Sequence, residues 1–199
     1  MIDAQLRRWI DPPLNSAGNF LAVRGVTANQ ITIVGFGMGL TAMLTIALQA
    51  YLLGLGLILL SRLCDGLDGA VARFTHITDL GGYLDIVLDF IFYSAIVFGF
   101  VLAQPDHATA GAFLIFSFIG TGSSFLAYST FAAKRGLTTS SRGQKSLYYL
   151  GGLTEGFETI TCLILMCLFP SAFWIFALIF GSLCWLTTLT RVYTATKTL

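Results

Sequence analysis

Four aspartates stand within hydrophobic stretches of the chain, where ionisable side chains are rare. Asp65 and Asp68 are three positions apart, and Asp85 and Asp89 are four positions apart. Residues at these separations lie on the same face of a helix. Because a charged side chain at membrane depth costs about 3 kcal/mol or more, such residues are functional candidates by default. The spacing therefore predicts two pairs of carboxylates, each on one face of its helix.

The two pairs are expected to lie at the same membrane level and to face each other. Only residues 74–80 separate the two hydrophobic stretches, which makes the helices antiparallel neighbours. Four facing carboxylates repel one another, and Arg62 and Arg73 are too few to neutralise them all. One or two divalent cations resolve this conflict. Because the cluster contains no His or Cys, its oxygen ligands favour Mg²⁺ or Mn²⁺, and less often Ca²⁺, over zinc.

Small residues accompany the aspartates and leave space beside them. They are Gly66, Gly69, Ala72 and Gly81. An open wall next to a metal site suits a ligand that brings its own phosphates, since Mg²⁺ is commonly shared between carboxylates and substrate phosphate oxygens. The metal can polarise a phosphoryl group, and a spare carboxylate can accept the proton of an attacking hydroxyl. Asp79, by contrast, is predicted to be a helix cap.

The composition places these carboxylates in a membrane protein. Of the 199 residues, 56% are hydrophobic and only 11% are charged, whereas about a quarter of the residues of a soluble domain are charged. The formal net charge of +1 provides no basic stripe, which argues against nucleic-acid binding. The four cysteines lie within apolar runs and are predicted to be packing residues.

The elements that must position the aspartates are six membrane-spanning helices. A span needs about 20 mostly apolar residues. If both termini are cytoplasmic, all eleven Lys and Arg residues fall on the inner side, which is the positive-inside pattern. The expected spans are residues 29–49, 51–73, 82–103, 108–133, 147–169 and 171–191.

Residues 1–199 are expected to form a single all-α membrane domain. Within it, residues 1–24 are predicted to form a short amphipathic helix on the membrane surface, because apolar and charged residues alternate there without a long apolar core. Residues 25–199 then form the bundle. Gly35, Gly37 and Gly39 in the first span are predicted to pack against other helices.

The aspartate pattern resembles the signature of the CDP-alcohol phosphotransferases, D-x2-D-G-x2-A-R followed by G-x3-D-x3-D. All eight signature positions match, namely Asp65, Asp68, Gly69, Ala72, Arg73, Gly81, Asp85 and Asp89. Residues 27–32 also resemble the family's T-P-N-x-I-T run, although Ala28 stands where the proline is usual. The segments 80–100 and 145–156 resemble a bacterial inner-membrane branch of the family rather than its phosphatidylglycerophosphate or phosphatidylserine synthases.

The resemblance implies roles for these residues. It makes Asp65, Asp68 and Asp85 metal ligands, and it makes Asp89 both a ligand and the general base. It implies Mg²⁺ or Mn²⁺ at two sites. It further implies a six-helix homodimer in the bacterial inner membrane, with both termini and the active site on the cytoplasmic side, using CDP-diacylglycerol or a related CDP-alcohol and releasing CMP. The residues it places at the CDP donor are Asn29, Thr32, Asp65, Gly69, Ala72, Arg73 and Gly81.

The acceptor alcohol is left open by the sequence. Glycerol 3-phosphate, inositol phosphate, a second lipid and another polyol all fit. The polar groups of the cytoplasmic halves that are candidates for its pocket are Lys145, Glu155, Arg135 and Arg191. Lys134, Arg135 and Arg142 have the simpler alternative role of enforcing topology.

Two other functional classes remain as alternatives. A divalent-cation transporter would need acidic or polar residues through the outer halves of the spans, which are nearly uncharged apart from Asp106 in a loop. A non-catalytic membrane scaffold would not need the complete set of signature residues.

Overall fold

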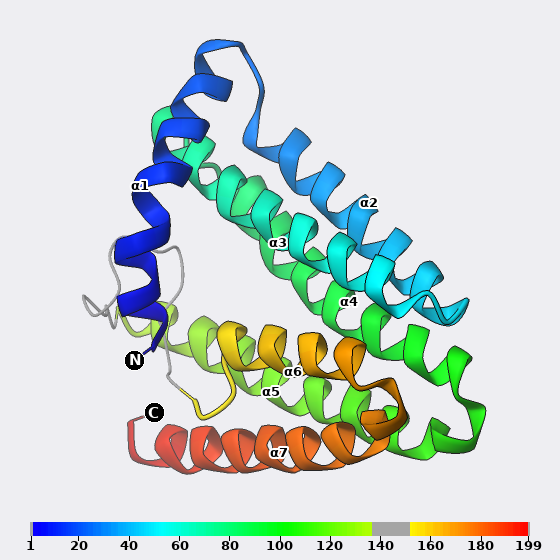
Figure 1. Cartoon of the computed structure of the whole chain (residues 1–199). Helices are drawn as coiled ribbons and strands as arrows, with labels where there is room; N and C mark the ends of the chain where they lie inside the picture. The colour runs from blue at the N-terminus through cyan, green and yellow to red at the C-terminus, as the bar shows by residue number, and fades with distance from the viewer. Residues whose placement is uncertain (1, 137–151, 199) are drawn as a thin grey trace. The chain divides into compact units, whose positions relative to one another are not determined.

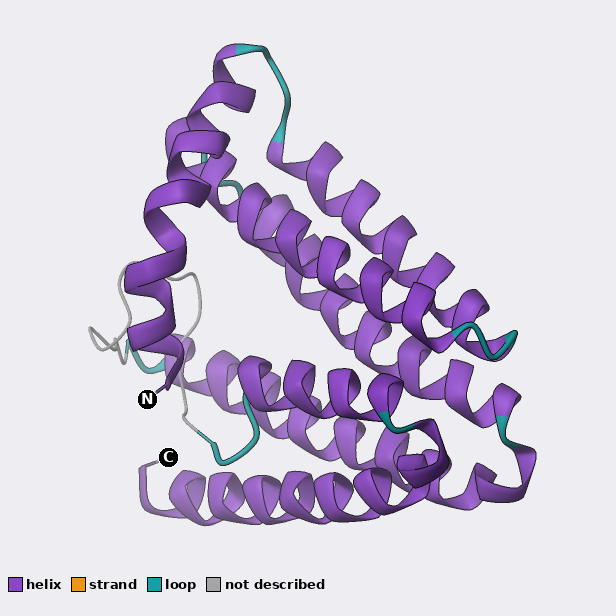
Figure 2. Ribbon diagram, viewed as in Figure 1, coloured by secondary structure: helices purple, strands orange, loops and turns teal. Residues whose placement is uncertain are grey.

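The computed structural model describes residues 2–136 and 152–198, and this part of the chain is helical, without a strand. Within these residues, seven α-helices follow one another, joined in two places by a single turn of 3₁₀-helix, Pro105–His107 and Pro170–Ala172 (Figures 1 and 2). The α-helices are α1 (Ile2–Val23), α2 (Ala28–Ala47), α3 (Tyr51–Phe74), α4 (Asp79–Ala103), α5 (Ala108–Lys134), α6 (Gly156–Leu168) and α7 (Phe173–Thr198). The chain forms two compact units, Met1–Gly99 and Phe100–Leu199.

Glycines allow close packing of α2 in the first unit. A Cβ atom at Gly35 would lie 2.7 Å from the Cβ atom of Cys64 on α3, and one at Gly39 would collide with the ring of Phe92 on α4. No atom of the described residues lies within 4 Å of the corresponding position at Gly37. The predicted packing role is therefore confirmed for Gly35 and Gly39, and for Gly37 it stays a prediction.

Local capping sets the starts of α2 and α4. The Thr27 hydroxyl accepts the Gln30 amide N–H at 3.4 Å, and the Gln30 side chain accepts the Thr27 amide N–H at 3.0 Å, which together form a capping box. At α4, the Thr78 hydroxyl accepts the amide N–H of Gly81 at 3.0 Å. Asp79 is the first residue of α4, so Thr78 supplies the capping oxygen that was predicted for Asp79.

Helix α1 packs against the part of α3 that carries the signature residues. A Cβ atom at Gly18 would lie 2.6 Å from the Cβ atom of Ala70, and one at Gly66 would lie 2.9 Å from the Leu14 side chain. Small residues at both points let the two backbones approach closely. The predicted N-terminal segment is thus a helix that covers one side of the signature region.

The second unit is built on the packing of α5 against α7. Phe100 and Phe173 stack with their ring centroids 4.9 Å apart. A Cβ atom at Gly181 would lie 2.8 Å from the ring of Phe113, so this glycine also allows a close helix contact. Helix α6 has only 13 residues, and its length of about 20 Å is less than the roughly 30 Å of a bilayer core.

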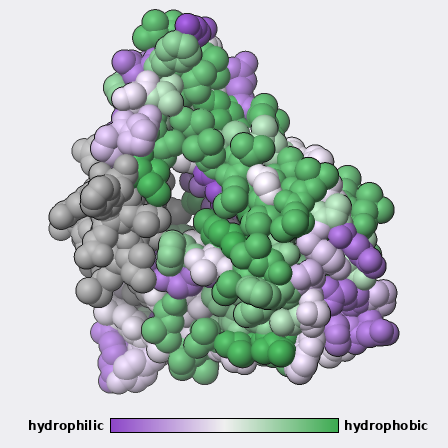
Figure 3. Space-filling view, in the orientation of Figure 1, coloured by the Kyte–Doolittle hydropathy of each residue, from purple (hydrophilic) through white to green (hydrophobic). Residues whose placement is uncertain are grey.

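The described residues include four segments that are long and apolar enough to cross a membrane, namely Ala28–Ala47, Asp79–Ala103, Pro105–Lys134 and Pro170–Thr198. Hydrophobic residues cover much of the face seen in Figure 3. Large apolar side chains such as Leu52, Ile33 and Ile179 are more than half exposed. A surface of this kind is stable in lipid but not in water, so the chain is an integral membrane protein.

Candidate metal and donor site

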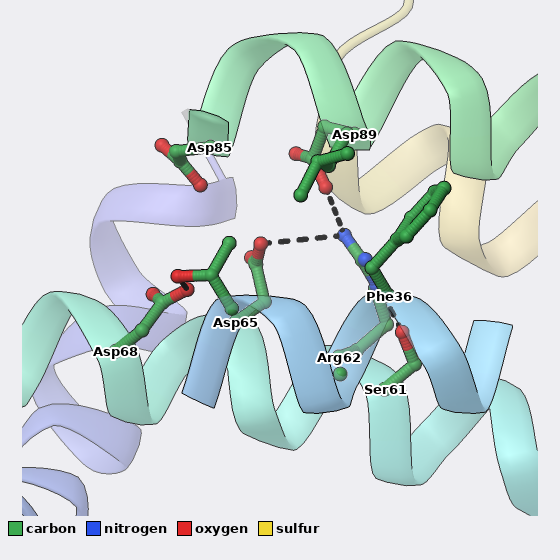
Figure 4. A pocket seen from close by; sticks show the side chains of 10 residues that line it. Phe36, Ser61, Arg62, Asp65, Asp68, Asp85 and Asp89 are labelled. Carbon is green, nitrogen blue, oxygen red and sulfur yellow. Dashed lines mark hydrogen bonds and ion pairs between the residues drawn. The ribbon is translucent and has the colours of Figure 1, made fainter. Parts of the chain in front are cut away.

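Three of the four aspartates form a tight group at the facing sides of α3 and α4. Asp65, Asp68 and Asp85 each offer one carboxylate oxygen, and these oxygens all lie within 4.8 Å of one another. Asp68 is buried, with 6% of its surface exposed, whereas Asp85 is exposed, so the group runs from the interior to the surface. Figure 4 shows the three side chains near one another. These three residues are called the carboxylate cluster below.

The cluster lines a small pocket between α2, α3 and α4. The three-residue spacing on α3 and the four-residue spacing on α4 turn all four aspartates toward this pocket, as helical periodicity requires. The structure therefore brings together the residues that the spacing predicted to face each other. The pocket is lined by Thr32, Gly35, Phe36, Ser61, Arg62, Asp65, Asp68, Asp85, Leu88 and Asp89.

The fourth aspartate, Asp89, has a different neighbour. Its Oδ1 atom accepts a hydrogen bond from Nη1 of Arg62 at 2.6 Å, and the same nitrogen lies 3.6 Å from Oδ1 of Asp65. Arg62 therefore stands between Asp89 and the carboxylate cluster (Figure 4). Sequence reasoning counted Arg62 only as a nearby charge. Its separation of three residues from Asp65 was the signal that both lie on one helix face.

Arg62 is enclosed mainly by aromatic rings. Its side chain is 13% exposed, and its guanidinium carbon lies 4.0 Å from the ring centroid of Phe92 and 5.6 Å from that of Tyr93. Nη2 donates a long hydrogen bond of 3.4 Å to the Ser61 hydroxyl. Nε is buried and has no hydrogen-bond partner among the described residues.

Asp68 is held by α2. The Thr32 hydroxyl lies 2.6 Å from Oδ2 of Asp68 and donates to it. Thr32 was predicted to lie at the CDP donor. The structure places its hydroxyl on a member of the carboxylate cluster, and its contact with the donor stays a prediction. Asn29, one turn earlier, faces the start of α4, since a Cβ atom at Gly81 would lie 3.3 Å from the Asn29 Oδ1 atom.

The remaining signature residues lie near the end of α3. Among the described residues, a Cβ atom at Gly69 would have one neighbour, Nη1 of Arg73 at 3.5 Å, so these residues leave space at this point of the helix. Nη2 of Arg73 donates a hydrogen bond of 2.8 Å to the Asn15 side chain on α1. The sequence did not predict this partner, because Asn15 lies 58 positions away. Ala72, beside Arg73, is half-buried.

The predicted acceptor residues that the structure describes belong to the second unit, and the aspartates to the first. Arg135 is exposed and follows the last residue of α5. Arg191 is 8% exposed, and its Nη1 donates to the backbone oxygen of Thr121 at 3.0 Å. Lys145 lies outside the described residues. Whether these residues share a pocket with the aspartates stays a prediction.

The two glutamates of the predicted fifth span cap a helix. Glu155 and Glu158 form a capping box at the start of α6, and the Glu155 carboxylate also accepts the Gly152 amide N–H at 3.3 Å. Acidic groups stabilise a helix N-terminus, where backbone N–H groups lack partners. Glu155 therefore has at least one structural role in addition to any contact with an acceptor.

Comparison with known proteins identifies the family. Residues 25–193 match the family model described as CDP-alcohol phosphatidyltransferase, so the chain belongs to this family. It is a membrane transferase of substituted phosphate groups, in a family of phospholipid-synthesis enzymes that use divalent metal ions.

Two relatives match over nearly their whole length. The chain is 52% identical over 200 residues to "Inner membrane protein YnjF" of Escherichia coli (strain K12), covering 100% of this chain and 97% of that protein. It is 30% identical over 197 residues to the archaetidylinositol phosphate synthase of Pyrococcus horikoshii, covering 98% of this chain and 97% of the relative.

Solved structures share the fold. The phosphatidylinositol phosphate synthase of Mycobacterium tuberculosis with CDP-DAG bound superposes with a TM-score of 0.75 at 18% identity, over 91% of this chain and 92% of that one. The same enzyme in complex with manganese and citrate gives a TM-score of 0.71 at 20% identity, over 91% and 88% of the two chains.

Proposed function

We propose that this protein transfers a phosphatidyl group from CDP-diacylglycerol to the hydroxyl of a small alcohol or polyol phosphate and releases CMP. The observation that carries this proposal is the carboxylate cluster, in which three signature aspartates converge within 4.8 Å. The solved neighbour that contains CDP-DAG supports this choice of donor.

The residues of the cluster fit a hard divalent cation. Their donor atoms are carboxylate oxygens, which suit Mg²⁺ or Mn²⁺, and a half-exposed site leaves room for substrate oxygens. Asp65, Asp68 and Asp85 would hold the first ion, and Asp89 would join Asp65 in holding a second. When bound, the ions neutralise charge on the pyrophosphate and polarise the phosphoryl group that is transferred.

Asp89 is the general base of the proposed reaction. The acceptor hydroxyl oxygen forms a bond to the phosphorus that carries diacylglycerol, while the bond from this phosphorus to the oxygen shared with CMP breaks. The bonding electrons leave with CMP, and the hydroxyl proton passes to the Asp89 carboxylate. Since Asp89 stands outside the tight group of three, one of its oxygens can accept this proton.

The donor nucleotide is proposed to lie over the end of α3 and the start of α4. The space at Gly69 admits the cytosine, and Arg73 supplies a positive charge for the CDP phosphates. The residues assigned to the donor are Asn29, Thr32, Asp65, Gly69, Ala72, Arg73 and Gly81.

A phosphorylated polyol is the acceptor that the relatives favour, because the Pyrococcus relative is named for an inositol phosphate product. Arg191 is a buried cation able to pair with an acceptor phosphate. Lys145, Arg135 and Glu155 are proposed to complete this pocket.

The proposed architecture is one membrane domain of six spans, with α1 lying on the membrane surface. Helix α3 has 24 residues, and its length of about 36 Å is enough to cross a bilayer. Both termini and the site lie on the cytoplasmic side of a bacterial inner membrane, as the basic residues and the name of the Escherichia coli relative suggest. The protein is proposed to be a homodimer.

A CMP-release assay tests the proposal. The full chain, purified in detergent, is supplied with CDP-diacylglycerol and a panel of polyol phosphates, with and without Mg²⁺ or Mn²⁺. CMP release is expected to need both the metal and one acceptor, to be lost in Asp85→Asn and to be retained in Asp106→Asn, a matched control far along the chain from the signature. Uptake of Mg²⁺ or Mn²⁺ into liposomes that contain the protein, without CMP release, would instead support a transporter.

A further inference from the structure

We propose that the guanidinium group of Arg62 occupies the site of the second divalent ion until the CDP donor binds. In this arrangement the carboxylate cluster takes one ion in the absence of donor. The second ion binds only when Arg62 releases Asp89. This inference rests on the proposed function, because it concerns the metal ions of the same site.

One nitrogen of Arg62 occupies the position of a bridging cation. Its Nη1 atom lies 2.6 Å from Oδ1 of Asp89 and 3.6 Å from Oδ1 of Asp65, and both interactions start from the same atom (Figure 4). Asp65 is also a member of the carboxylate cluster. The guanidinium therefore competes for the two carboxylates that a second ion would need, and it does not block the cluster itself.

The way in which Arg62 is held indicates that it can be released. A buried arginine with a purely structural role is expected to have its donors satisfied. Here Nε is buried without a hydrogen-bond partner among the described residues, and the bond from Nη2 to Ser61 is long at 3.4 Å. Of these two hydrogen bonds, the one to Asp89 is the shorter, at 2.6 Å. The ring of Phe92, 4.0 Å from the guanidinium carbon, can keep a cation–π contact when that bond opens.

The charges of the pocket favour the same order of binding. Four aspartates and one arginine line it. Carboxylates must be deprotonated to bind a metal ion, and in that state the pocket has an excess of three negative charges. One divalent ion reduces this excess to a single negative charge. A second ion in the absence of donor would make the half-buried site positive, which is unfavourable at low dielectric. The pyrophosphate of the donor supplies the negative charge that the second ion needs.

Counting bound Mn²⁺ tests the role of Arg62 without relying on turnover. The full chain in detergent is titrated with Mn²⁺ and followed by electron paramagnetic resonance, first alone and then with CDP-diacylglycerol. We expect the wild type to bind one Mn²⁺ per chain alone and two with the donor. Arg62→Met is expected to bind two without donor, with the second site tightened about 10- to 100-fold, the effect of losing one charge-assisted hydrogen bond.

Two further variants separate this role from general damage. Arg62→Lys keeps the positive charge and is expected to restore the preference for one ion, at least in part. Arg24→Met removes an arginine that stacks on Phe20, outside the pocket, and is expected to bind Mn²⁺ as the wild type does. If Arg62→Met does not fold, the titrations of the wild type and of Arg62→Lys still decide the question.

The inference is overturned if the wild type binds two Mn²⁺ ions without donor, or if Arg62→Met still binds only one. In either case metal-dependent CMP release would leave the proposed function standing. Absence of Mn²⁺ binding in the wild type, with or without donor, would instead remove the metal site and the proposed function together.

Discussion

Two carboxylates of the site are oriented by hydrogen-bond donors from residues other than the four aspartates. The Thr32 hydroxyl donates to Asp68, and the Arg62 guanidinium donates to Asp89. Hydrogen bonds to an ionised group are shorter and stronger than those between neutral groups. Thr32 and Arg62 therefore determine which oxygens of these two carboxylates stay available for a metal ion or a proton.

The assignment of Asp89 as the base predicts the effect of Asp89→Asn. The amide keeps the size of the side chain but cannot accept the hydroxyl proton, so CMP release is expected to fall about 100- to 10,000-fold. Mn²⁺ binding to the carboxylate cluster should persist in the same variant. Turnover close to that of the wild type, measured beside Asp106→Asn, would rule out this role.

The bond between Thr32 and Asp68 predicts a metal-affinity effect for Thr32→Val. This change keeps the shape of the side chain and removes the hydroxyl, so Mn²⁺ affinity is expected to fall about tenfold, the lower end of the range for groups that orient metal ligands. Thr32→Ser should restore it. If Thr32→Val weakens binding of CDP-diacylglycerol and leaves Mn²⁺ affinity unchanged, Thr32 acts on the donor instead.

At the scale of the helices, the site depends on how closely α2 approaches α3. Gly35 lines the pocket and lies against Cys64, whereas Gly37 on the same helix has no neighbouring atom within 4 Å of its added Cβ among the described residues. Both are helical glycines of the predicted packing motif, so they form a natural pair for comparing packing with intrinsic helix propensity.

Gly35→Ala is expected to lower the stability of the protein by about 1–3 kcal/mol, because the added methyl group overpacks the contact with α3. Gly37→Ala should leave stability unchanged or raise it slightly, since alanine is the better helix former. Thermal unfolding in detergent measures both effects. Equal unfolding temperatures for Gly35→Ala and Gly37→Ala would mean that α2 and α3 are not in close contact at Gly35.

At the scale of the whole molecule, the distribution of basic residues predicts its orientation in the membrane. Lys197 near the C-terminus is expected inside, and Asp106 in the turn after α4 is expected outside. The thiol introduced by Lys197→Cys should react with an impermeant thiol reagent only after the cells are opened. The thiol introduced by Asp106→Cys should react with the same reagent in intact spheroplasts. Labelling of both from the same side would contradict the six-span arrangement.

The sequence by itself determined which acidic residues face each other and that the chain lies in a membrane. Spacings of three and four residues placed the aspartates on two helix faces, and the signature from Asp65 to Asp89 predicted the family to which the chain belongs. These features could be predicted because helical periodicity and hydropathy are local properties of the chain.

Only the tertiary structure decided which groups meet in the pocket. Asp89 pairs with Arg62 and is not a member of the carboxylate cluster. The Thr32 hydroxyl donates to Asp68, which lies 36 positions further along the chain. Such contacts depend on the rotation and separation of neighbouring helices. Those are set by the packing of small residues such as Gly35 and Gly39 against side chains on other helices, and the spacing of residues along one helix does not specify them.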